Sequence, residues 1–173
     1  NPTYFYYTSG DGHLEAVENA LHEITYYTYT VDGQIESAKD ARGCTDYYTY
    51  DCHHRVTSMK DGEGNVTYYG YDDVDNRTSV TDPRGFTTYF AYDVLDRRTS
   101  IQDPLNQLNY IYYDAEGNTT TQEDALQRRS YFYFDSRNRS FCAEDAQKNR
   151  SYFTYTVRDE RSSAKDARGN VSY

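Results

Sequence analysis

The sequence lacks the aliphatic residues from which most small proteins build a core. Its 173 residues include no Trp, one Met (Met59) and three Pro, and they contain few Leu, Ile or Val. A polar, charged chain of this kind often stays disordered because it cannot bury enough apolar surface. The 22 Tyr and 7 Phe argue against disorder, since each such side chain buries roughly 150–250 Å² when it is packed.

Positive charge and long apolar runs are also scarce. The chain has 18 Lys and Arg against 28 Asp and Glu, for a net charge of −10. A nucleic-acid partner requires a basic stripe, so we expect none. No run reaches the roughly 18 apolar residues of a membrane helix, so we expect no membrane span. No signal peptide is visible, and because Asn1 is not a start residue we expect a mature or excised piece.

Cysteine is limited to three residues, Cys44, Cys52 and Cys142. Their number is odd, and they show no C-x-x-C spacing. This number and spacing of cysteines fit neither a disulfide framework nor a zinc site. We interpret them as incidental thiols.

What the sequence does contain is an internal repeat, and such a period decides the fold. Every Tyr lies in the first five columns of a 21-residue period that fills eight rows and leaves Tyr173 in the second column of a ninth. The rows begin at Tyr4, Thr25, Asp46, Thr67, Thr88, Asn109, Ser130 and Ser151. We therefore expect residues 1–173 to form a single array of repeats, which is a segment of a longer array or filament.

The columns of this array predict two strands in each row. Columns one to five are aromatic, β-prone and too short for a helix, so they predict strand A. Columns eleven to fifteen, such as residues 77–81, predict strand B. Columns three and five of strand A point one way and column two the other. The residues of column thirteen have small side chains, so a large ring on the neighbouring strand can lie over them. Such cross-strand pairs contribute roughly 0.2–1 kcal/mol each.

The first turn of a row follows a Tyr-Asp pair. We assign a structural role to Tyr50, Asp51, Tyr71, Asp72, Tyr92, Asp93, Tyr113, Asp114, Phe134 and Asp135. Three residues after the Asp stands a residue type that is enriched at positive φ. These are Gly12, Gly33, His54, Asp75, Asp96, Gly117, Asn138 and Asp159. A type I turn followed by a positive-φ bulge residue fits this pattern.

The second turn begins at an Asp that recurs every 21 residues, at Asp40, Asp61, Asp82, Asp103, Asp124, Asp145 and Asp166. Pro83 and Pro104 follow two of these acids, and Gly85 stands three residues after Asp82. Asp at the first position, Pro at the second and Gly at the fourth are typical of a type I turn. Elsewhere Ala replaces Pro and Asn, Gln or Lys replaces Gly, so this turn is less strictly specified.

These elements predict an all-β fold of about sixteen short strands in a curved antiparallel meander. Sixteen strands spaced about 4.8 Å apart give a sheet roughly 75–80 Å wide. Sheets of that width curl, split or close, and a free edge invites pairing with another chain. We therefore expect the sheet to close or spiral into a tube or shell, or to join further repeats or identical chains.

The motif Tyr-Asp-x-x-Gly/Asp-Arg/Asn, followed by Thr-Ser-Val-Thr-Asp-Pro-x-Gly-x-Thr-Thr-Tyr, resembles the Rhs/YD-repeat family. Its best copies are residues 71–92 and 92–110. In that family, long arrays wind a β-sheet strip into a hollow shell. Such shells enclose toxin domains in Rhs toxins and in the BC component of Tc toxins, and YD repeats also occur in teneurins and wall-associated proteins. The resemblance implies an extracellular or cell-surface location.

This chain departs from the family pattern in two places. The first row has Thr8-Ser9 where Tyr-Asp is expected. The family's aliphatic residue after the first turn becomes Arg at Arg77, Arg98 and Arg161. The arginines are expected to weaken a dry shell interior.

No residue pattern selects a catalytic or metal site, so we expect no enzyme activity and no cofactor. The pair His53-His54 and the acids Asp72, Asp73 and Asp75 are explained as turn residues, with metal binding as the alternative. Six N-x-Ser/Thr sequences fall at or near turns and are candidate glycosylation sites. They are Asn65, Asn76, Asn118, Asn138, Asn149 and Asn170. Chance occurrence in a Thr/Ser-rich repeat is the alternative.

The leading hypothesis is a structural assembly protein, a β-sheet wall of an extracellular filament, tube or shell. The first alternative is a carbohydrate-binding adhesin module, in which exposed rings stack on sugars. It requires that the column-two tyrosines face solvent. The second alternative is a fragment of a toxin-enclosing Rhs shell, which requires a longer parent chain.

Overall fold

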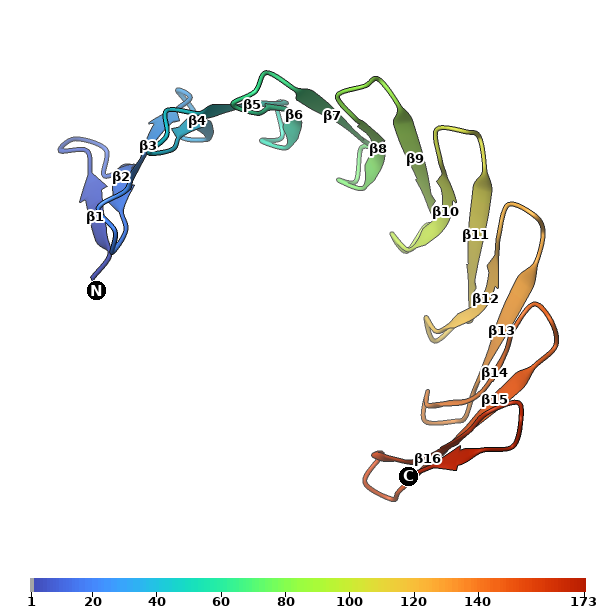
Figure 1. Cartoon of the computed structure of the whole chain (residues 1–173). Helices are drawn as coiled ribbons and strands as arrows, with labels where there is room; N and C mark the ends of the chain where they lie inside the picture. The colour runs from blue at the N-terminus through green and yellow to red at the C-terminus, as the bar shows by residue number, and fades with distance from the viewer. Residues whose placement is uncertain (1) are drawn as a thin grey trace. The chain divides into compact units, whose positions relative to one another are not determined.

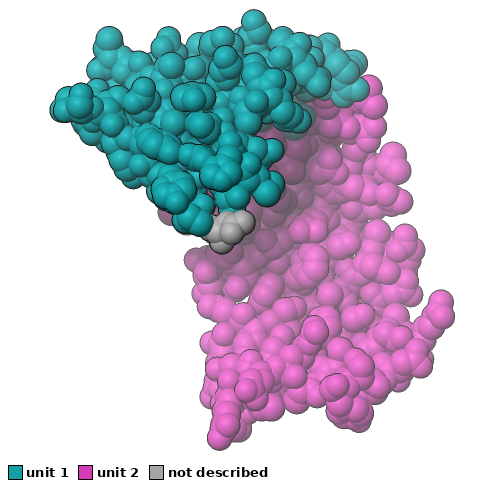
Figure 2. Space-filling model, turned by 60° about the vertical axis from the view of Figure 1, so that its left-hand side comes forward, with its two compact units in different colours: residues 1–88 teal, residues 89–173 magenta. Residues whose placement is uncertain are grey.

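A computed structural model describes residues 2–173, and over that range it is all-β. The predicted fold class is confirmed: antiparallel hairpins follow one another along the chain (Figure 1). The chain divides into two compact units, residues 1–88 and residues 89–173 (Figure 2). The division falls at the start of the fifth row. Within residues 2–173 there is no helix of the length and apolarity that crossing a membrane demands.

Strand B occupies the predicted columns eleven to fifteen in every row. These strands are β2 (Leu14–Glu18), β4 (Ile35–Lys39), β6 (Val56–Lys60), β8 (Arg77–Thr81), β10 (Arg98–Gln102), β12 (Thr119–Glu123), β14 (Ser140–Glu144) and β16 (Arg161–Lys165).

Strand A begins one residue earlier than predicted in the second to eighth rows. These strands are β3 (Ile24–Tyr29), β5 (Thr45–Tyr50), β7 (Val66–Tyr71), β9 (Thr87–Tyr92), β11 (Leu108–Tyr113), β13 (Arg129–Phe134) and β15 (Arg150–Tyr155). The first row contributes β1 (Tyr4–Tyr7), and a short β17 (Val171–Ser172) opens a ninth row.

The pairing register places the small residues of strand B opposite an aromatic residue of the strand A that follows. Ser37 of β4 lies opposite Thr28 of its own row and opposite Tyr47 of the next row. In the second unit, Cys142 lies opposite Tyr133 and Tyr152 in the same way. The predicted arrangement of a large ring beside a small residue on the neighbouring strand is confirmed.

Both turns of a row have the same construction. In the first turn, the amide of His54 donates to the carbonyl of Asp51 at 3.1 Å, and the amide of Asp51 donates to the carbonyl of Arg55 at 3.0 Å. In the second turn, Gly85 and Asp82 make the corresponding bonds. The last turn residue has a positive φ in both turns of all eight rows, and it is the fourth residue except in the longer first turn of the first row, where it is Gly12, the fifth. The positive φ predicted for the first turn is confirmed, and the second turn shares it.

The first row differs from the others by one residue. Tyr4 pairs with Glu18, as Tyr26 pairs with Lys39, so Tyr4 and not Phe5 occupies the second column. Tyr7 and Thr8 therefore stand in the Tyr-Asp positions, and the assignment of Thr8-Ser9 to them is wrong. The cause is a longer turn, in which the amide of Thr8 bonds the carbonyl of His13, five residues away. Turn length sets strand register, so one added residue moves every side chain of β1.

The sheet has no conventional hydrophobic core. Among residues 2–173 only Ala16, Ser37, Cys142 and Glu144 are buried, and no large side chain is fully enclosed. Three of these four lie in the small-residue column of strand B. Strand A alternates between exposed and half-buried residues, as in the pattern of β5. Each row therefore depends on its two neighbours for the burial of its rings.

The positive φ of the turn residues gives a first testable prediction. Gly85→Ala should lower the free energy of unfolding by about 1–2 kcal/mol, because an L-residue is strained in the left-handed region. Gly85 has a φ of 86° and nothing within 4 Å of an added Cβ. Urea unfolding followed by circular dichroism measures the change.

Gly10→Ala is the matched control. Gly10 also has nothing within 4 Å of an added Cβ, but its φ lies outside the left-handed range. We expect no loss of stability there. Equal loss in both variants would contradict a conformational origin.

Candidate functional site: the contacts between repeats

In five rows, the Tyr of column five connects its row to the preceding one. Its hydroxyl donates to the backbone carbonyl of the first residue of the preceding strand B. The donor–acceptor distances are 2.8 Å for Tyr29 to Leu14, 2.7 Å for Tyr50 to Ile35, 2.9 Å for Tyr71 to Val56, 2.9 Å for Tyr113 to Arg98 and 2.7 Å for Tyr155 to Ser140. The predicted Tyr-Asp residues thus contribute a bond between rows, which the sequence pattern did not reveal.

The Asp of each pair organises its own turn. One carboxylate oxygen of Asp51 accepts the amides of His53 at 2.9 Å and Arg55 at 3.1 Å. In the second turn, Asp82 accepts the amides of Arg84 and Phe86 in the same manner, both at 2.9 Å. The 21-spaced acids are therefore turn residues, as predicted from their spacing.

The second oxygen of these acids binds a side chain of the same turn. The Arg139 guanidinium beside Asp135 lowers the pKa of that carboxyl to about 2. Arg97 lowers the pKa of Asp93 for the same reason, and Asn118 lowers the pKa of Asp114 through its amide. All three contacts favour the ionised acid, which is the form that accepts the backbone amides.

An arginine in column ten makes the strongest contacts between rows. Nε of Arg97 donates to Asp93 of its own row at 2.8 Å, and Nη1 donates to the carbonyl of Asp114 in the next row at 3.1 Å. The guanidinium carbon lies 4.6 Å from the centre of the Tyr113 ring. Arg55 and Arg139 are placed in the same way.

Sequence reasoning missed this role of column ten. The signal was present, because Arg55, Arg97 and Arg139 recur 42 residues apart, which is every second row. Only the structure shows that the guanidinium crosses to the next row.

The arginines that replace the family's aliphatic residue lie over aromatic rings. Arg77 lies 5.8 Å from the centre of the Tyr69 ring, and Arg161 lies 5.3 Å from that of Phe153. Arg98 lies 5.8 Å from the Phe90 ring. Cation–π attraction therefore takes the place of an aliphatic contact at this column.

The column-two tyrosines form an exposed ladder in the first unit, and in the second unit half-buried Tyr131 interrupts it. Tyr26, Tyr47 and Tyr68 are 49–55% exposed in the first unit, and Tyr89 and Tyr152 are 53% and 43% exposed in the second. No second layer of the described chain covers them. This is the face that the sugar-binding alternative requires.

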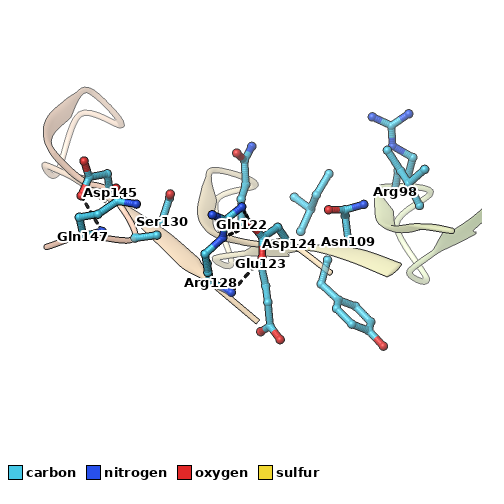
Figure 3. A pocket seen from close by; sticks show the side chains of 13 residues that line it. Arg98, Asn109, Gln122, Glu123, Asp124, Arg128, Ser130, Asp145 and Gln147 are labelled. Atoms are coloured by element: carbon cyan, nitrogen blue, oxygen red, sulfur yellow. Dashed lines mark hydrogen bonds and ion pairs between the residues drawn. The ribbon is translucent and has the colours of Figure 1, made fainter. Parts of the chain in front are cut away.

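Shallow hollows lie between the rows on the face of the sheet near the second turns. One of them, drawn in Figure 3, is bordered by Asn109, Asp124, Arg128, Asp145 and Gln147. In this view the Arg128 side chain reaches Asp124, and Gln147 bonds Asp145. Two further hollows follow at intervals of one row. Their aspartates are engaged in turns, and Glu123 and Glu144 pair with Arg129 and Arg150, so the hollows follow from the repeat and select no catalytic group.

The remaining candidate residues have turn roles. Five of the six candidate glycosylation residues donate their side-chain amide to a turn aspartate: Asn65, Asn76, Asn118, Asn149 and Asn170. Asn138 instead occupies the positive-φ position, at 59°. His53 and His54 are exposed turn residues. Over residues 2–173, no three His, Cys, Asp or Glu side chains are grouped as metal ligands. Glycosylation itself stays a prediction.

A scan against known families matches the family described as RHS Repeat at residues 50–88 and 71–107. The resemblance to the Rhs/YD-repeat family is confirmed. A search of curated proteins found no match. The rows outside residues 50–107 share the period and the strand pairing of the matched rows.

Solved structures share the fold over nearly the whole chain. The crystal structure of TcdB2-TccC3 has a TM-score of 0.79 at 9% identity, covering 95% of this chain and 11% of that chain. TcdB2-TccC3-Cdc42 has a TM-score of 0.78 at 9% identity, covering 95% and 10%. TcdB2-TccC3 without its hypervariable C-terminal region has a TM-score of 0.71 at 12% identity, covering 94% and 10%. The chain thus spans about a tenth of each of these proteins.

The tyrosine bond between rows gives the second prediction. Tyr113→Phe should reduce the free energy of unfolding by about 0.5–1.5 kcal/mol, because it removes the hydroxyl that bonds the Arg98 carbonyl. Phe134→Tyr should raise it, because column five lacks a hydroxyl only in that row among the second to eighth rows. Chemical denaturation of each variant measures both changes.

The control is Tyr110→Phe, in column two of the same strand, whose hydroxyl makes no hydrogen bond in the structure. It should leave stability unchanged. A loss at Tyr110 equal to that at Tyr113 would mean that the hydroxyl bond does not matter.

Proposed function

We propose that this chain is a segment of a β-sheet wall in an extracellular shell, tube or filament, with no catalysis of its own. The observation that carries this proposal is the recurrence of the same contacts from one row to the next. A tyrosine hydroxyl bonds the preceding row, and a turn aspartate organises each hairpin. Contacts of this kind can be extended by any number of rows, which is what a wall requires.

Two further features support a wall. The sheet has almost no buried side chains, so its rows gain burial only from adjoining rows. Similar folds occur within much longer chains, of which the aligned part is about a tenth. We therefore propose self-association with further repeats, either in the same polypeptide or in identical chains.

Electron microscopy of the native particle tests the proposal. We expect a shell, tube or filament whose wall shows strands at the spacing of a β-sheet, about 4.8 Å. Discrete monomers of this chain, with no larger array, would contradict the wall proposal. Mass spectrometry of the intact polypeptide separates two forms of wall, since a longer chain carrying an enclosed domain would identify the toxin-shell alternative.

A second candidate function is carbohydrate binding by the exposed tyrosine ladder. The observation that favours it is the exposure of Tyr47 and Tyr68, whose half-open rings lie on one face in neighbouring rows. Partly solvated aromatic rings of this kind can stack against amphipathic ligands such as sugars.

A glycan array with the folded protein tests the second candidate. Binding that falls at least tenfold in Tyr47→Ala, but not in the turn variant Leu95→Ala, would support it. Leu95 is 64% exposed and lies in a turn of the other unit. The absence of any bound glycan would remove the candidate and leave the wall proposal standing.

A further inference from the structure

Neighbouring rows are joined by backbone bonds only near the second turn. In the second unit, the junction between the fifth and sixth rows has three residue pairs, from Ser100–Tyr110 to Gln102–Leu108. The next two junctions, β12 with β13 and β14 with β15, also have three pairs each. Toward the first turn, side chains alone connect one row to the next. Differences between junctions must therefore come from side chains.

Two of these three junctions are fastened at the first turn, which means that a column-ten arginine and a tyrosine hydroxyl both contact the neighbouring row. Between the fifth and sixth rows, Arg97 lies over Tyr113 and bonds the carbonyl of Asp114, while the Tyr113 hydroxyl bonds the Arg98 carbonyl. Between the seventh and eighth rows, Arg139 lies 4.9 Å from the centre of the Tyr155 ring. Arg139 also bonds Asp159 at 2.7 Å.

The junction between the sixth and seventh rows has neither the arginine contact nor the tyrosine hydroxyl bond. Column ten of the sixth row holds Asn118, whose amide stays with Asp114 of its own row at 2.9 Å. Its only bond to the next row is a 3.2 Å contact with Asn138. The Tyr position of the seventh row is Phe134, which has no hydroxyl to donate.

The ion pairs at the other end of the junctions do not explain this contrast. Arg129 pairs with Glu123 at the unfastened junction, and Arg150 pairs with Glu144 at the fastened one that follows. Both distances are 2.7 Å. Lys148 adds a second pair with Glu144 at 3.2 Å, but the feature that both fastened junctions share is the arginine at the first turn.

The first unit shows the same alternation. Arg55 fastens the third row to the fourth, 4.7 Å from the centre of the Tyr71 ring, with bonds to the Asp72 carbonyl and to Asp75. The His13 ring stacks on Tyr29 at 4.6 Å and 17°, joining the first row to the second. Gly33 gives that ring room, because an added Cβ would lie 3.3 Å from it.

Between the second and third rows, only the tyrosine bond from Tyr50 to Ile35 is present at the first turn. This junction, like the one between the sixth and seventh rows, runs from an even row to an odd one.

We propose that the mechanical unit of this sheet is a pair of rows, 42 residues long. The column-ten side chain of each odd row fastens it to the following even row. Within each unit, the junction from an even row to the next odd row is the line along which the sheet opens or bends. A wall built from such pairs of rows would bend most easily at the junctions between pairs, which recur at every second row.

Amide hydrogen exchange of the whole chain, measured by nuclear magnetic resonance, tests the proposal. The ladder amides at Thr121–Tyr131 should exchange on the order of tenfold faster than those at Ser100–Tyr110 and Cys142–Tyr152. This is the change expected when a cation–π contact and a charged hydrogen bond are missing. Similar protection at all three junctions would overturn the proposal.

Two opposite substitutions assign the effect to column ten. Arg97→Asn keeps the type of bond to the turn aspartate that Asn118 makes, but it removes the contacts with the next row. It should speed exchange at Ser100–Tyr110 about tenfold and leave Cys142–Tyr152 unchanged. Asn118→Arg should slow exchange at Thr121–Tyr131.

Asn118→Arg decides the matter if Arg97→Asn fails to fold, because it adds a contact and removes none from the backbone. No slowing at Thr121–Tyr131 would contradict the role of column ten. The outcome does not depend on whether the chain forms a wall, since it concerns contacts within one unit.

Discussion

The turn aspartate is the constraint on which the rest of this structure depends. Its carboxylate accepts two backbone amides and holds four residues in a turn that ends at positive φ, as at Asp82 and Gly85. Turn length sets the register of the flanking strands, and register decides which face each ring occupies. The first row shows the consequence, because there Thr8 stands in the aspartate position of a longer turn and β1 is displaced by one residue.

With the turns in place, the sheet is stabilised without an aliphatic core. In the strand B column that holds Ala16, Ser37 and Cys142, a tyrosine lies opposite on both sides of Ala16 and Cys142 and on one side of Ser37. These cross-strand contacts are individually small, roughly 0.2–1 kcal/mol, but they recur in every row. Most of the aromatic side chains therefore pack against neighbouring strands of the sheet. The column-two tyrosines are the ones that stay exposed and could contact a ligand.

The side chains at the ends of the hairpins add a second level of order. The tyrosine hydroxyl and the column-ten guanidinium both donate to a backbone carbonyl of another row. Backbone groups of this kind are costly to leave without partners. Because the guanidinium occurs only in every second row, as at Arg55, Arg97 and Arg139, the sequence repeat of 21 residues becomes a structural repeat of twice that length.

The sequence alone determined the strands and turns, because those are local properties. Columns eleven to fifteen give strand B in every row, and His54, Asp75 and Asn138 take the positive φ predicted from residue type. The tertiary structure alone decided which rows hold one another. The carbonyl that Tyr113 bonds lies 15 residues upstream, and the one that Arg97 bonds lies 17 residues downstream. No local propensity encodes those partners, since they meet only after two separate hairpins have paired in register.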